Sequence, residues 1–177
     1  EIGDDLFEKF KIDKTLINDF EISGNVNVRA NIKNDSNGFK LSDSLQLECL
    51  GNKLVIPKVP YEFENVYGQV LFSGDKLQLN DMSAVIANGS GDEAVSVREG
   101  EIQFENKQLG GAVLSGEIHN LKLDERLLGI IPVSTREHFS EYEPGGVIDA
   151  RTDKLVITRK GDVSDIAING SLLLKEC

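Results

Sequence analysis

The sequence is short of the residues that most binding and spanning functions need. It has no tryptophan and three tyrosines among 177 residues, whereas sugar-binding β-domains usually present exposed aromatic rings on a flat platform. No apolar run approaches the roughly 18 residues of a membrane-spanning helix, and the N-terminus lacks the layout of a signal peptide. The chain opens on "EIGDDLFEKF", without methionine. We therefore expect residues 1–177 to be a single segment of a longer protein whose targeting signals lie elsewhere.

Residues that carry chemistry are equally scarce. His119 and His138 are the two histidines, and neither has a second His or Cys at metal-ligand spacing. There is no G-x-S-x-G motif and no credible Cys–His pair for nucleophilic catalysis. We expect no catalytic residue, no metal and no cofactor, and hence a protein that is not an enzyme. Cys49 and Cys177 lie 128 positions apart, and the sequence leaves open whether they form a disulfide.

Positive charge is in the minority. The chain carries 30 acidic and 19 basic residues, a net charge of −11. Such a surface repels phosphate backbones, so nucleic acid is not an expected partner. Apolar residues make up 40% and charged residues 28%, which is ordinary globular composition and enough for a real core.

What the sequence does contain is strand pattern. Strict alternation of apolar and polar residues runs from Gly24 to Lys33, followed by Asn37-Gly38 as a hairpin turn and a return strand near 39–50. A second tight hairpin is expected at Gly74-Asp75. The stretch at 53–63 carries two prolines and is interpreted as an edge or linker. The apolar positions expected on one face of these strands are Val26, Val28, Ala30, Ile32, Leu45, Leu47, Leu77 and Leu79.

Two regions have helical spacing instead. Apolar residues near 4–20 and near 124–143 predict two short helix pairs, with Asp124 as an N-cap of the second pair. The expected fold is α+β and dominated by strands. Its curved or elongated sheet should be antiparallel and hairpin-linked, because the connections are too short for βαβ crossovers.

One stretch occurs almost twice. "DFEISGNVNVR" at 19–29 is echoed by "EYEPGGVIDAR" at 141–151, which is 122 positions later. Each copy is expected to be a structural joint: an aromatic residue ends a helix, glycine forms its left-handed cap, and a strand follows. The joint residues are Phe20, Gly24, Tyr142 and Gly146. The echo predicts an internal repeat of about 122 residues.

Two further runs carry a family resemblance. "VPYEFENVYGQVLFSGDKLQLNDMSAVIANGSGDEAVSVREGEI" at 59–102 and "SGEIHNLKLDERLLGIIPVSTREHFSEYEPGGVIDA" at 115–150 resemble the AsmA-like (AsmA/TamB-type) repeat proteins of Gram-negative bacteria. The shared motifs are patterns of apolar, glycine and proline positions. The resemblance implies a periplasmic segment of an inner-membrane-anchored protein. It further implies a non-catalytic role in outer-membrane homeostasis, in which phospholipid moves along an apolar β-groove and the membrane contacts lie outside this segment.

Two alternatives stay open at this stage. The apolar positions can form a closed core instead of a groove, in which case the chain is a β-sandwich binding module for carbohydrate or protein, or a purely structural spacer repeat. The composition favours the closed core, and the family resemblance favours the groove.

Overall fold

The protein is almost entirely β-sheet. The computed structural model describes residues 21–35, 38–56, 59–87, 89, 91–105, 108–130, 145–160 and 163–175, and 82% of them lie in strands. The expectation of an α+β fold with two helix pairs is therefore wrong. Within the described residues the one helix is α2, Glu125–Ile130. The expected pair at 4–20 and the part of the second pair beyond Ile130 lie outside the described residues.

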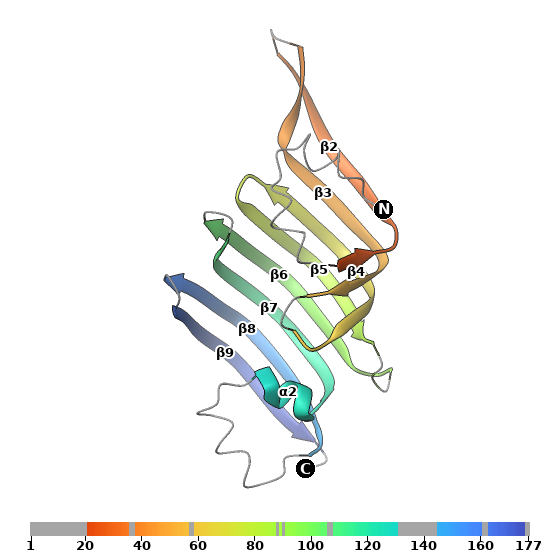
Figure 1. Cartoon of the computed structure of the whole chain (residues 1–177), viewed down its shortest axis with the longest axis vertical. Coiled ribbons are helices and arrows are strands. Elements are labelled where there is room, and N and C mark those ends of the chain that lie inside the picture. Colours follow the sequence, from red (N-terminus) through yellow and green to blue (C-terminus); the bar gives the residue numbers. More distant parts are fainter. Residues whose placement is uncertain are drawn as a thin grey trace.

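Nine strands form one antiparallel sheet, shown in Figure 1. Their order across the sheet is β1-β3-β4-β5-β6-β7-β8-β9, and β2 also pairs with β3. The strands are β1 (Glu21–Ser23), β2 (Val26–Asp35), β3 (Gly38–Val55), β4 (Glu62–Ser73), β5 (Lys76–Ile86), β6 (Ala94–Glu105), β7 (Gln108–Lys122), β8 (Val147–Lys160) and β9 (Val163–Lys175).

Short connections produce this meander, as the sequence predicts. Ser73 pairs with Lys76, which confirms the tight hairpin at Gly74-Asp75. The first hairpin differs by one residue, because Gly38 pairs with Asp35 and so belongs to strand β3. Of the stretch at 53–63, the first residues end β3 and the last begin β4, neither of which is an edge strand. The described residues between Val55 and Glu62 belong to the connection of the two strands, as the linker interpretation expects.

Most long strands carry a bulge near the middle of the sheet. Register shifts occur in β3 to β8, and residues with positive φ accompany four of them: Gly51 (82°), Asn65 (53°), Asp81 (48°) and Asn120 (54°). An extra residue bends a strand and increases its twist. It also changes which alternate residues point to a given face. In β5, for example, Leu77 and Leu79 precede the bulge, whereas Ala84 and Ile86 continue the same face after it.

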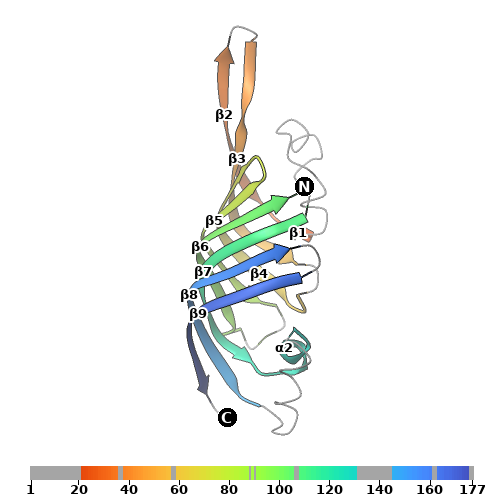
Figure 2. The same cartoon turned by 90° about the vertical axis from the view of Figure 1, so that its left-hand side faces the viewer.

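The aligned bulges allow the sheet to curve. Figure 2 shows the strands bending around the side on which α2 lies. On that side a compact core of Tyr61, Ile86, Leu121 and Ile148 packs beneath Leu127 of the helix. The core therefore occupies one end of the concave side, which we call the inner face. The convex side is called the outer face.

The two glycine joints are only partly as expected. Gly24 and Gly146 both have positive φ, 119° and 112°. However, Gly24 follows strand β1 and not a helix, so it connects two strands that pair with the same neighbour. A Cβ at Gly24 would lie 2.9 Å from Nδ2 of the buried Asn52, whose amide donates to the Ser23 carbonyl. Phe20 and Tyr142 lie outside the described residues, and the 122-residue repeat stays a prediction.

Candidate functional site

The inner face carries a continuous apolar surface. Directly opposed residues of antiparallel strands share a face, so the register defines this surface. One row runs through Val28, Leu47, Val70, Leu79, Gly100, Leu114, Leu155 and Ile168. A parallel row runs through Ala30, Leu45, Phe72, Leu77, Ile102, Ala112, Ile157 and Ile166. Both rows cross the sheet from β2 to β9.

The apolar positions named from the sequence fall on this surface. Val28 and Ala30 oppose Leu47 and Leu45, while Val26 opposes Cys49 one step further along β2. Leu77 and Leu79 oppose Phe72 and Val70 on the next pair of strands. The backbone of Ile32 pairs with that of Leu41, and the structure does not describe the Ile32 side chain. The structure thus brings two distant groups of these residues together across β3, β4 and β5.

The apolar positions expected from the sequence make up only part of the inner face. They do not include the inner residues of β6 to β9, among them Ile102, Ala112, Leu114, Leu155, Ile157, Ile166 and Ile168. Their signal was present as alternation, but a bulge interrupts the alternation in three of these four strands. Each half-strand then offers fewer alternating positions, so its pattern is weaker when it is considered alone.

The apolar surface is covered unevenly. Leu45, Leu47, Phe72 and Ala112 are buried. Towards the C-terminal edge the cover is lost, and Ile166, Ile168, Leu172 and Leu174 are all exposed. Within the described residues no second sheet packs on the inner face, and α2 covers only the end near Tyr61. Among the described residues, the inner face is therefore an apolar surface of one sheet that is buried around Leu45 and Phe72 and exposed along β9.

The helix end of the face combines apolar packing with a few polar groups. The Arg126 guanidinium lies 5.0 Å from the centre of the Tyr61 ring, a cation–π contact. Desolvation of the phenol, followed by the nearby charge of Asp124, raises the pKa of Tyr61 to about 12. Asp124 Oδ1 accepts hydrogen bonds from the backbone N–H groups of Arg126 and Leu127, at 3.0 and 3.1 Å. The predicted N-cap is confirmed.

Glu93 is a fully buried acid at this same end. Its Oε1 lies 3.8 Å from Lys122 Nζ, and neither of its carboxylate oxygens has a hydrogen-bond partner among the described residues. A Cβ at Gly89 would approach Oε2 to 2.5 Å, so the acid lies tightly against the β5–β6 connection. Among the described residues no group of three or more His, Cys, Asp or Glu side chains is arranged to hold a metal ion.

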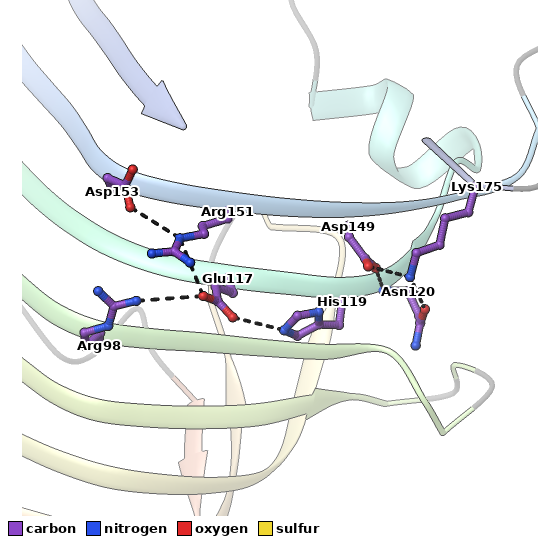
Figure 3. A network of polar contacts seen from close by, with 8 residues as sticks. All are labelled: Arg98, Glu117, His119, Asn120, Asp149, Arg151, Asp153 and Lys175. Carbon is purple, nitrogen blue, oxygen red and sulfur yellow. Dashed lines mark hydrogen bonds and ion pairs between the residues drawn. The ribbon is translucent and has the colours of Figure 1, made fainter. Parts of the chain in front are cut away.

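The outer face is polar where the inner face is apolar. Figure 3 shows Glu117 between Arg98, Arg151 and His119, at 3.8, 3.8 and 3.3 Å, while Arg151 also reaches Asp153. In a second group Asp149 accepts from the Asn120 backbone N–H and pairs with Lys175. These two contacts, in that order, hold the pKa of Asp149 below its usual range. Exposed pairs of this kind add little stability each but keep the outer face hydrated.

Among the described residues no helix is long and apolar enough to cross a membrane. Cys49 is half-buried, and burial raises the pKa of its thiol. Cys49 is a free cysteine, so it forms no disulfide in the structure. Cys177 and His138 lie outside the described residues.

The two faces thus differ in chemistry, and the inner one is the candidate site. Comparisons with family models, curated proteins and solved structures found no match. The resemblance to AsmA-like proteins consequently remains a hypothesis that rests on the residues at 59–102 and 115–150.

Proposed function

We propose that the inner face binds the acyl chains of phospholipids, in a periplasmic segment of a protein that maintains the outer membrane. The observation that supports this proposal is the continuous apolar surface across β2 to β9. A surface with many apolar side chains and few polar groups suits a ligand that has no polar pattern to recognise.

The sidedness of the sheet favours an acyl ligand over a closed core. Its β9 end, where Ile166, Ile168 and Leu172 are exposed, is a contiguous apolar patch of the kind that marks binding surfaces. Each buried methylene of an acyl chain contributes about 0.8 kcal/mol, so a chain laid along one apolar row gains substantial affinity without a specific contact. The proposed role requires no catalytic residue and no cofactor.

A matched pair of substitutions tests the proposal. Val28 on the inner face and Val113 on the outer face are 42% and 43% exposed, so the same change can be made at equal exposure on opposite sides. The full chain is incubated with phosphatidylethanolamine vesicles, repurified and analysed by native mass spectrometry. Val28→Asp should reduce the lipid-bound fraction at least about tenfold, because an acyl chain would have to cover a carboxylate.

Val113→Asp is the control and should retain the bound fraction of the unsubstituted protein. Circular dichroism should show intact strands for both variants, since both side chains are partly in water. Equal lipid binding by both variants, or no bound lipid in the parent chain, would refute the proposal. Unfolding caused by Val28→Asp alone would instead support a closed core.

A further inference from the structure

Among the described strands, β9 is the last of the sheet, and it has an unusually high content of exposed apolar residues. It is 13 residues long, and within the described residues it pairs only with β8. Five of the ten exposed large hydrophobic residues belong to it, and Ile168 is the most exposed of all at 70%. Proteins normally protect an edge strand with proline, inward-pointing charge or short length. The described part of β9 contains none of these devices, so its edge is suited to pairing.

We infer that β9 pairs antiparallel with β9 of a second copy of this chain, around a two-fold axis at Gly170. In this register Ile166 faces Leu174 of the second copy, and Ile168 faces Leu172 of the second copy, all on the inner face. On the outer face Asp165 faces Lys175 of the second copy. Two-fold symmetry repeats every pair, so the interface contains two such pairs of opposite charge.

Neighbouring registers are less complementary. A shift by one residue would set inner-face side chains opposite outer-face ones, which a regular sheet does not allow. Centring the pair on Ile168 would place Gly170 opposite Ile166 and would separate Asp165 from Lys175. The Gly170 register alone matches large apolar residues with each other and acid with base.

The pairing closes on itself and joins the two inner faces. An isologous contact of this kind gives a dimer and not a filament, because each copy uses its β9 edge once. The apolar rows of one copy then continue into those of the other across the axis. This inference does not depend on whether the inner face binds lipid.

Charge reversal at the two ends of β9 tests the register. Asp165→Lys places lysine opposite Lys175, and Lys175→Glu places glutamate opposite Asp165, so either variant alone contains two like-charge pairs. Each should weaken dimerisation by about tenfold or more. An equimolar mixture restores opposite charges at both positions, and its dimer should recover the affinity of the parent chain.

Sedimentation velocity from about 1 to about 200 µM, under reducing conditions and near 0.15 M salt, provides the measurement. Asp75→Lys, in the β4–β5 turn, makes the same charge change away from the edge and should leave the dimer intact. Lys175 also forms an ion pair with Asp149 of its own chain, and Lys175→Glu removes that pair in the variant alone and in the mixture alike. Recovery in the mixture therefore reports the contact between the two copies and not the contact with Asp149. A monomer at every concentration, open-ended growth, or failure of the mixture to recover would overturn the inference.

Discussion

At the scale of single residues, several glycines are required by the bulges of neighbouring strands. A Cβ on Gly116 would lie 2.1 Å from the Ser96 carbonyl oxygen, beside the register shift of β6. A Cβ on Gly170 would approach the Arg151 carbonyl to the same distance, beside the shift of β8. Gly68 meets the bulge of β5 in the same way, with Met82 Cα at 2.7 Å. The bulged backbone therefore protrudes where its neighbour has no side chain.

Gly116→Ala tests this requirement. The added methyl group must push against backbone atoms that cannot rotate away, so we expect the free energy of unfolding to fall by about 2 kcal/mol or more. Urea denaturation followed by circular dichroism measures the change. Gly129→Ala in α2 is the control, because nothing lies within 4 Å of its Cβ position and alanine favours a helix by about 1 kcal/mol. Equal stability of Gly116→Ala and the parent chain would contradict the proposed close approach.

The sequence alone could not show that these positions require glycine. Gly68, Gly116 and Gly170 stand inside expected strands, where glycine signals either a turn or a close contact. Which of the two applies depends on the residue opposite, and that residue is set by the register of another strand. The turn at Gly74, by contrast, was predictable because its signal is local.

At the scale of elements, α2 is held at its start by Asp124. The helix has only six residues, so its intrinsic stability is low and its cap contributes a large share. Desolvation raises the pKa of Asp124, but hydrogen bonds from the Arg126 side chain and from the Leu127 backbone outweigh it and leave the pKa below its usual value. The carboxylate form is therefore the one that stabilises the helix.

Asp124→Ala should lower the free energy of unfolding by about 1 kcal/mol at pH 7. Because the folded pKa is depressed, the charged cap stabilises the protein above the unfolded value of about 3.9. That contribution is lost as the pH falls through the folded pKa, so the difference between variant and parent should be smaller at strongly acid pH than at pH 7. Urea titrations at both pH values measure it, and Asp124→Asn should keep part of the cap. A difference that stays constant with pH would contradict the role of the charge.

Local pattern predicted the strands better than the helices. The alternation from Val26 to Ile32 marks β2 because one face of that strand is apolar and the other polar. The α+β expectation is wrong because 82% of the described residues lie in strands, and the one described helix is Glu125–Ile130. Residues 4–20 and 131–143, where helical spacing predicts the rest of the two pairs, lie outside the described residues. The bulges were missed because they interrupt the alternation at Asp81, Asn120 and equivalent positions, where the phase of the pattern changes in mid-strand.

At the scale of the whole molecule, the described strands form one antiparallel sheet whose two faces differ in chemistry. Hairpin connections predicted an antiparallel meander, and the register confirms it. Connection lengths do not say whether a meander folds back as a sandwich or stays as one layer, because both use the same hairpins. That decision lies in the long-range contacts of the inner face, which the sequence could only suggest through resemblance.

Net charge acts on the whole molecule, and under the proposed lipid-binding role it would influence from which vesicles the protein takes lipid. With a charge of −11, the protein is repelled by anionic bilayers over roughly a Debye length, about 10 Å at 0.1 M salt. Lipid uptake from phosphatidylglycerol vesicles should therefore be several-fold slower than from phosphatidylcholine vesicles at about 20 mM salt. Raising the salt to about 0.5 M screens the charge, so the two rates should converge.

Transfer of a fluorescent phospholipid to the protein measures both rates. Val28→Asp separates the two effects, since it should reduce the bound amount from either vesicle, whereas salt should change only the ratio of the rates. Among the described residues of the outer face, Arg98, Arg151 and Lys175 each lie close to an acid, so their charges do little to offset the repulsion. A preference for the anionic vesicles at low salt would show that a local contact, and not the overall charge, governs the approach.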